Sequence, residues 1–104
     1  MLFRSLGAIA SKAHFEKILS YIDIAKSEGG SLLCGGHAVK PEGRCANGYF
    51  IAPTIIEGLD SNCRTNQEEI FGPVVTLQPF DTEEEALTLA NSTAYGLEIG
   101  RAHV

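Results

Sequence analysis

Apolar residues recur at helical spacing near the start of the chain. Those that follow the i, i+3, i+4, i+7 spacing of one apolar face are Phe15, Ile18, Leu19, Ile22 and Ala25. The spacing predicts a helix over residues 11–28, with Ser11 as its N-cap and the glycine pair at 29–30 as its end. We interpret it as a packing helix, and we interpret His14 near its start as an exposed polar residue rather than a catalyst.

Short apolar and β-branched runs follow this helix and are separated by turn residues. They predict strands over Ser31–Cys34, over Tyr49–Ile56 and over Val74–Phe80. Because proline cannot donate to a strand ladder, Pro53 places the middle strand at an edge or at a bend. The segment 37–47 mixes proline, glycine and charged residues, which is typical of a surface loop.

A second helix is predicted to begin at Asp81 or Thr82. Each of these residues is followed three positions later by a glutamate, Glu84 or Glu85, which is the spacing of a capping box. The inner face of this helix is predicted to consist of Ala86, Leu87, Leu89 and Ala90. Strands that lie between helices along the chain favour an α/β sheet.

Between the last two predicted strands lies a stretch with two carboxylates, an aromatic residue and a Gly-Pro pair. Proline disfavours the α region for the residue before it, and glycine accepts backbone angles that other residues avoid. A helical turn that carries Glu68 and Glu69 is therefore predicted to end near Gly72, and a strand to begin at Val74. Such an arrangement places a carboxylate and an aromatic ring at the mouth of a sheet, where α/β folds tend to bind ligands.

Longer strings identify a family. Gly-Tyr-Phe-Ile-Ala-Pro-Thr-Ile-Ile, Glu-Glu-Ile-Phe-Gly-Pro-Val, Pro-Phe-Asp-Thr-Glu-Glu-Glu-Ala and Ala-Asn-Ser-Thr-Ala-Tyr-Gly-Leu occur in that order. Together they closely resemble the NAD(P)-dependent aldehyde dehydrogenase superfamily. The resemblance implies that residues 6–97 are a partial aldehyde dehydrogenase catalytic (Rossmann-like) domain of the α/β class. Because whole enzymes of that family are several times longer, we interpret the chain as a fragment from the C-terminal half of the catalytic domain.

The resemblance also implies cofactor contacts. In the family, the second glutamate of Glu-Glu-Ile-Phe-Gly-Pro binds the ribose hydroxyls next to the nicotinamide, and the phenylalanine packs beside the nicotinamide. These positions fall on Glu69 and Phe71, so the expected cofactor is NAD, with NADP not excluded. A carboxylate suits the task because it accepts hydrogen bonds from two neighbouring hydroxyls at once. Glu68 has no such role by resemblance, and we interpret it as a solvated charge.

No catalytic residue is expected within this chain. The family uses a cysteine nucleophile in a Gly-Gln-x-Cys context and a glutamate base in a Glu-Leu-Gly-Gly context, and neither string occurs here. Arg64 would lower the pKa of the neighbouring Cys63, but we do not interpret Cys63 as the nucleophile. Cys34, in an apolar strand, is expected to be buried and inert. The fragment alone is therefore predicted to be inactive. The alternative is a free-standing α/β module that binds a ligand or a partner without redox chemistry.

The two ends of the chain do not follow the family pattern. Leu-Phe-Arg-Ser at residues 2–5 and Glu-Ile-Gly-Arg-Ala-His-Val at residues 98–104 read as in-frame translations of common short-read sequencing adapters. Our hypothesis is that residues 1–5 and 98–104 are non-native, and such segments are excluded from the prediction of the fold. The alternative is natural variation at both termini. Codons that are absent from the genomic exon would support the hypothesis, and genomic codons would contradict it.

Composition excludes several other function classes. The formal net charge is −5, from 8 Lys and Arg against 13 Asp and Glu, which argues against nonspecific nucleic-acid binding. No apolar run has the length needed to span a bilayer, so no membrane association is expected. The 3 cysteines are widely spaced and form no Cys-x-x-Cys pair, which favours a reducing compartment and no metal site. We expect a cytoplasmic protein.

The subfamily and partners are also inferred from the resemblance. Ser-Lys-Ala-His, Leu-Leu-Cys-Gly-Gly and Asn-Gln-Glu-Glu-Ile-Phe-Gly-Pro-Val-Val-Thr look most like semialdehyde dehydrogenases of the 2-aminomuconic and 2-hydroxymuconic type. The expected partner is a small-molecule aldehyde bound by the longer parent protein, and the parent is expected to be a homo-oligomer.

Overall fold

The computed structural model describes residues 7–96. The hypothesis about residues 1–5 and 98–104 therefore lies outside the described residues. The elements in chain order are α1 (Lys12–Ser27), β1 (Ser31–Cys34), β2 (Ala38–Val39), the 3₁₀ turn η1 (Gly43–Cys45), β3 (Phe50–Ile51), β4 (Thr54–Glu57), α2 (Arg64–Gln67), β5 (Val74–Leu77) and α3 (Glu83–Ala90).

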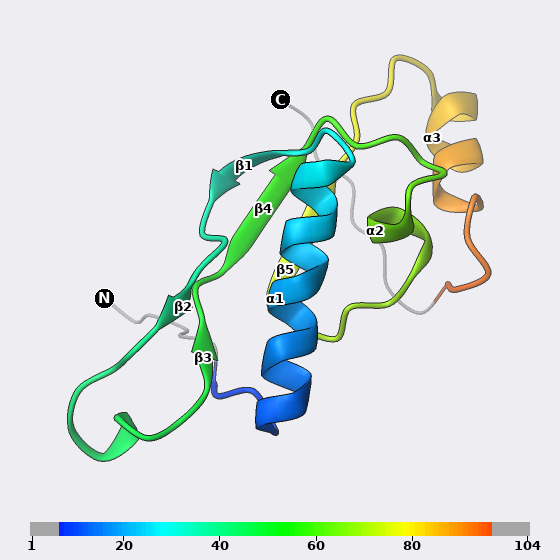
Figure 1. Ribbon diagram of the computed structural model, residues 1–104. Helices are drawn as coiled ribbons and strands as arrows, with labels where there is room; N and C mark the ends of the chain where they lie inside the picture. Colours follow the sequence, from blue (N-terminus) through cyan, green and yellow to red (C-terminus); the bar gives the residue numbers. More distant parts are fainter. Residues whose placement is uncertain (1–6, 97–104) are drawn as a thin grey trace, which may run out of the picture.

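The main sheet has three strands in the order β1-β4-β5, and α1 lies across one of its faces (Figure 1). β1 pairs antiparallel with β4, whereas β4 and β5 are parallel, with Thr54 opposite Val74 and Glu57 opposite Leu77. A separate antiparallel pair joins β2 to β3. The α/β prediction is confirmed, and the sheet is mixed because it contains one antiparallel and one parallel pair.

Helix α1 forms where the apolar spacing predicts it. The Ser11 hydroxyl accepts a hydrogen bond from the backbone N–H of His14 at 3.1 Å, which confirms the predicted N-cap. The buried residues of α1 are Ile18, Tyr21, Ile22 and Ala25. Tyr21 is absent from the predicted inner face, and Phe15 is only half-buried. The helix covers the sheet through two clusters, one around Ile18 and Ile22 and one around Ala25.

The predicted strand over 49–56 forms two short strands, β3 and β4, on either side of Pro53. This confirms the predicted bend at Pro53 and excludes the edge alternative for β4, which is the central strand of its sheet. The backbone at Gly35, with φ +72°, passes very close to Pro53. A Cβ at position 35 would lie 2.1 Å from the Pro53 carbonyl oxygen. The buried hydroxyl of Thr54 accepts from the Gly36 N–H at 2.9 Å and donates to the Ala52 carbonyl at 2.8 Å. Only glycine fits at position 35, and the crossing joins the small hairpin to the main sheet.

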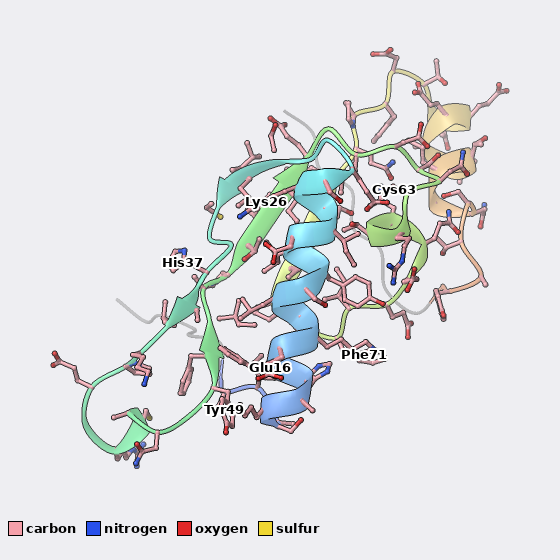
Figure 2. The ribbon with its side chains drawn as sticks, in the orientation of Figure 1. Glu16, Lys26, His37, Tyr49, Cys63 and Phe71 are labelled. Carbon is pink, nitrogen blue, oxygen red and sulfur yellow. The ribbon has the colours of Figure 1, made fainter. Side chains whose placement is uncertain are left out.

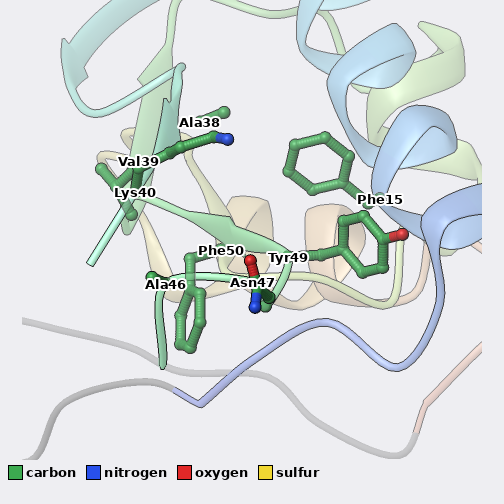
Figure 3. Close-up of a pocket in the computed structure, with 9 residues that line it drawn as sticks. Phe15, Ala38, Val39, Lys40, Ala46, Asn47, Tyr49 and Phe50 are labelled. Atoms are coloured by element: carbon green, nitrogen blue, oxygen red, sulfur yellow. The ribbon is translucent and has the colours of Figure 1, made fainter. Parts of the chain in front are cut away.

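The predicted surface loop over 37–47 contains β2 and the η1 turn, which the prediction missed. Both are exposed, and β2 gains its strand geometry only from pairing with β3. The hairpin and Phe15 enclose an open hollow of about 260 Å³, lined by side chains that include Val39, Tyr49 and Phe50 (Figure 3). The rings of Phe15 and Tyr49 pack with their centroids 5.5 Å apart.

Helix α3 begins with Thr82 as its N-cap, one of the two predicted residues. The Thr82 hydroxyl accepts from the Glu85 N–H at 3.1 Å, while the Glu85 carboxylate accepts from the Asp81 N–H at 3.0 Å. Both predicted cap residues thus contribute to the start of the helix. Leu87 was predicted to face inward but is 57% exposed, and the strand predicted to run to Phe80 ends at Leu77. Across residues 7–96, no helix combines the length and apolar character needed to cross a membrane.

Candidate functional site

The two predicted cofactor contacts lie in the crossover segment, residues 64–73, which consists of α2 and the stretch that leads from it to β5. The predicted helical turn under Glu68 and Glu69 is wrong in its position. Helix α2 ends at Gln67, and Glu68 is already extended, with ψ 149°. The strand does begin at Val74, as predicted, immediately after the Gly-Pro pair. Glu69 and Phe71 therefore lie on extended and irregular backbone between a short helix and a strand.

Phe71 has an unusual backbone and an unusual exposure. It has φ +56°, and it is the one non-glycine residue among residues 7–96 with a positive φ. This left-handed conformation costs an L-residue about 1–2 kcal/mol. Its ring is 75% exposed and projects from the loop beside α1 (Figure 2). A strained residue that presents a large apolar ring to solvent is a candidate for a ligand contact.

The carboxylate of Glu69, on the same segment, is a second candidate for a ligand contact. Its side chain is exposed and makes no hydrogen bond to another residue in the range 7–96. The predicted location is wrong in one respect. Ligands of open α/β sheets bind outside the carboxyl ends of the strands, whereas Phe71 precedes the amino end of β5, where Val74 lies opposite Thr54.

Glu68 is only partly solvated, with its side chain 39% exposed, and it has partners that the interpretation from sequence missed. Its carboxylate accepts a hydrogen bond from the Tyr21 hydroxyl at 2.8 Å and two from the Arg64 guanidinium, at 2.6 and 3.2 Å. The Arg64 guanidinium, followed by the Tyr21 hydroxyl, lowers the pKa of Glu68 from 4.5 to about 2. The hydrogen bond to Glu68 in turn raises the pKa of Tyr21. Glu68 therefore joins the crossover segment to α1.

Glu28, directly after α1, binds the start of α2. Its carboxylate accepts from the Arg64 N–H at 2.7 Å, from the Thr65 N–H at 3.2 Å and from the Thr65 hydroxyl at 2.6 Å. These bonds satisfy N–H groups that the first turn of a helix leaves unpaired. The Thr65 hydroxyl and the two backbone N–H groups lower the pKa of Glu28.

The crossover segment also approaches α1 closely through Gly72. A Cβ at this position would lie 2.7 Å from Cδ1, 2.9 Å from Cγ1 and 3.0 Å from Cγ2 of Ile18. The half-buried Ile70 packs against the same core cluster. Glycine at position 72 thus lets the backbone lie directly on the helix, and the adjoining Phe71 carbonyl lies 2.6 Å from the His14 Nε2 atom.

His14, Tyr21 and Glu28 are the residues of this site that the sequence interpretation missed. His14 was predicted to be exposed and is half-buried, because its ring lies against the Phe71 carbonyl. No motif marks these three residues. Their regular spacing of seven along α1 was the one available signal.

The cysteines do not form a reactive site in the described part of the chain. Cys63 is half-buried, and burial raises its pKa. The expectation that Arg64 would lower this pKa is wrong, because the guanidinium binds Glu68 and lies over the Tyr21 ring at 5.8 Å. Cys34 is exposed rather than buried. No group of three or more His, Cys, Asp or Glu side chains within 7–96 could hold a metal ion.

Sequence comparison places these residues in a family. The sequence pattern described as "Aldehyde dehydrogenase family" matches residues 4–100. The chain belongs to the aldehyde dehydrogenase family. It is 54% identical over 95 residues to the acetaldehyde dehydrogenase of Pseudomonas aeruginosa, with 91% of this chain and 19% of that protein covered. It is 43% identical over 106 aligned positions, gaps included, to 4-trimethylaminobutyraldehyde dehydrogenase A of Danio rerio, with 94% of this chain and 21% of that protein covered.

Solved structures agree with the sequence match. The betaine aldehyde dehydrogenase of Staphylococcus aureus in complex with NAD+ is similar with a TM-score of 0.79 at 45% identity, covering 89% of this chain and 19% of that one. The indole-3-acetaldehyde dehydrogenase of P. syringae in complex with NAD+ and IAA is similar with a TM-score of 0.80 at 39% identity, covering 88% and 18%. The chain spans about a fifth of the length of the relatives it matches. The named substrates of these relatives differ, and none is a muconate-type semialdehyde.

Proposed function

We propose that the chain is part of an enzyme that oxidises an aldehyde to the carboxylic acid with NAD, and that Glu69 and Phe71 contact the cofactor. Membership of the aldehyde dehydrogenase family supports the reaction class, and two of the similar solved structures are complexes with NAD+. The observation that carries the assignment is local. The Glu69 carboxylate is exposed and has no partner among residues 7–96, and Phe71 holds an exposed ring on strained backbone two residues later.

Each residue has a chemistry that fits this assignment. The Glu69 carboxylate can accept hydrogen bonds from the two neighbouring hydroxyls of a ribose, and bonds to a charged acceptor are the stronger kind. The Phe71 ring offers an apolar surface to a flat heteroaromatic ring, which gains contact area when it is covered. NAD, when bound, supplies the hydride acceptor of the reaction. NADP remains an alternative cofactor, because the pair recognises only the nicotinamide end.

The chemistry of the aldehyde itself is assigned to parts of a longer parent protein. Within this chain we assign no nucleophile and no general base, so we expect the isolated chain to be inactive. We propose a small-molecule aldehyde as substrate, with a muconate-type semialdehyde as one class to assay, and we propose a homo-oligomeric parent. The alternative of a free-standing binding module is not favoured, because the family match extends over residues 4–100.

The experiment begins by extending the coding sequence past both ends of the chain. An open frame that runs upstream into Gly-Gln-x-Cys provides the full-length protein for expression. Glu69→Gln should then raise the KM for NAD about tenfold or more, because a charged acceptor is lost. Production of NADH is followed with acetaldehyde, betaine aldehyde and a muconate-type semialdehyde as substrates.

Glu83→Gln is the matched control, because it removes an exposed carboxylate from the start of α3, away from the crossover segment. It should leave the KM for NAD unchanged. Equal KM values for the parent protein and Glu69→Gln would remove the cofactor assignment. A start and a stop codon that bracket the segment would instead favour the binding module.

A further inference from the structure

Three polar residues, His14, Tyr21 and Glu28, recur at intervals of seven along α1 and its C-cap. Seven residues make about two turns of an α-helix, so such residues share one face and follow one another at about 10 Å intervals. We call these three residues the α1 polar row. Tyr21 is 6% exposed, and its polar hydroxyl is satisfied by the hydrogen bond to the Glu68 carboxylate.

The α1 polar row meets the crossover segment at three successive points. Glu28 binds the N–H groups of Arg64 and Thr65 at 2.7 and 3.2 Å. Tyr21 donates to the Glu68 carboxylate at 2.8 Å, and the His14 ring meets the Phe71 carbonyl at 2.6 Å. The crossover segment therefore runs antiparallel to α1, and each member of the row holds a different part of it.

The backbone between these contacts explains where the cofactor residues point. Inward-facing and exposed side chains alternate along residues 68–71, and the left-handed backbone of Phe71 belongs to this arrangement. Glu68 faces α1 and binds Tyr21, Glu69 is exposed, Ile70 packs against the core cluster of α1, and the Phe71 ring is exposed. Contacts on the inward side therefore set the direction of the two outward side chains. Only positions 69 and 70 lie between the contacts of Tyr21 and His14.

We propose that His14, Tyr21 and Glu28 are positioning residues that hold Glu69 and Phe71 in their binding geometry before the cofactor arrives. The proposal rests on the cofactor assignment of the previous section. The three residues do not need to touch the cofactor. They restrict the conformations of the crossover segment. Cofactor binding therefore loses less conformational entropy than it would with an unrestrained segment. The left-handed backbone of Phe71 needs such support, because it is unfavourable in isolation.

The hydrogen bond of His14 has a defined donor. A carbonyl oxygen only accepts, so the His14 Nε2 atom carries the hydrogen in its bond to Phe71. Glutamine also ends in an N–H donor and can restore this bond, whereas leucine cannot. The pair His14→Leu and His14→Gln therefore separates loss of the donor from loss of the imidazole ring.

The test uses the full-length enzyme and begins with Tyr21→Phe, which removes one hydroxyl and keeps the ring. We expect the Kd for NAD to rise about fivefold, the effect of one lost hydrogen bond, and hydrogen exchange to become faster at residues 68–72. The control is Tyr49→Phe, because the Tyr49 hydroxyl makes no hydrogen bond to another residue in the range 7–96. This control should leave both quantities unchanged. His14→Leu should also weaken NAD binding, and His14→Gln should restore most of it.

A double-mutant cycle separates a positioning role from a merely structural one. Because Tyr21 acts through the placement of Glu69, Tyr21→Phe should have a much smaller effect on the Kd for NAD in the Glu69→Gln background than alone. Unchanged NAD affinity in Tyr21→Phe, or fully additive effects, would overturn the proposal. Failure of Glu69→Gln itself to weaken binding would instead overturn the cofactor assignment. The two ideas therefore fail in different ways.

Discussion

Two neighbouring regions of the molecule are stabilised in different ways. The packed region, where α1 covers the sheet, is held by apolar side chains such as Ile22, Ala25 and Ile56, each at most 1% exposed. The crossover segment beside it is held to α1 by hydrogen bonds and a close glycine contact. It leaves Glu69 and Phe71 in solvent. The side chains of the packed region contact one another, whereas the crossover segment exposes a carboxylate and an aromatic ring that have no partner among residues 7–96.

This difference separates residues that maintain the fold from residues that are available for binding. A packed apolar side chain has already removed its apolar surface from water on folding, so it can bury no further surface against a ligand. An exposed ring on left-handed backbone does the reverse, since it costs stability and can gain contacts later. Changes in the packed region should therefore alter stability, and changes in the crossover segment should alter binding. All of the following comparisons refer to the full-length protein.

The largest effect is expected from Gly35→Ala, at the crossing that joins the small hairpin to the packed region. The added Cβ would lie 2.1 Å from the Pro53 carbonyl oxygen, and the backbone has φ +72°. Backbone displacement and left-handed strain together should lower the unfolding free energy by about 3 kcal/mol, measured by chemical denaturation. Gly7→Ala, where no atom lies within 4 Å of the added Cβ, is the control and should change stability by about 0.5 kcal/mol at most. Equal effects of the two substitutions would contradict the close crossing.

A smaller effect is expected at Phe71, where two substitutions separate the effect on NAD binding from the effect on stability. Phe71→Ala and Phe71→Gly both remove the ring, so both should weaken NAD binding in a titration. Only glycine accepts the backbone with φ +56° without strain, so the glycine variant should be more stable than the alanine variant by about 1 kcal/mol. A glycine variant that is less stable than the alanine variant would show that this backbone is not strained.

The smallest effect concerns the pH dependence of the contact between Glu68 and α1. The folded-state pKa of Glu68 is lowered from 4.5 to about 2. A lowered carboxyl pKa stabilises the folded state above the unfolded pKa, and this contribution is lost as the pH falls toward the folded pKa. The difference in unfolding free energy between the parent protein and Glu68→Gln should therefore be constant above pH 4.5 and shrink below it.

Denaturation in urea at a series of pH values, down to the lowest at which both proteins stay folded, measures this difference. Glu83→Gln provides the control, because Glu83 is exposed on α3. Its difference from the parent protein should not follow the same curve. A Glu68→Gln difference that is independent of pH below 4.5 would contradict the lowered pKa.

Sequence reasoning succeeded where structure is local. The spacing of apolar residues predicted α1, and cap residues located the starts of α1 and α3. It failed where distant residues decide the outcome. The close approach of Gly35 to the Pro53 carbonyl was not predicted, and Leu87 is 57% exposed although its spacing predicted an inward position. Helical spacing predicts which residues share a face, but it cannot predict what that face contacts.

The candidate site was predictable only in part. The string around Glu69 and Phe71 indicated cofactor contacts by resemblance, and that assignment stays a prediction. The partners of Glu68 could not be predicted, because Tyr21 is 47 positions away along the chain. The local sequence therefore indicated the candidate cofactor contacts. The residues of α1 that bind the crossover segment became visible only in the fold.

The seven-residue period of the α1 polar row limits how the chain length can vary. Deleting one residue between Tyr21 and Glu28 would rotate one of these side chains by about 100° around the helix axis relative to the other, so they would no longer share one face. Insertion of two whole turns would keep the face but separate them by a further 10 Å or so. Neither change can be absorbed by the short crossover segment. Length differences among related chains should therefore collect in the exposed stretch 37–47, and α1 should keep a constant length.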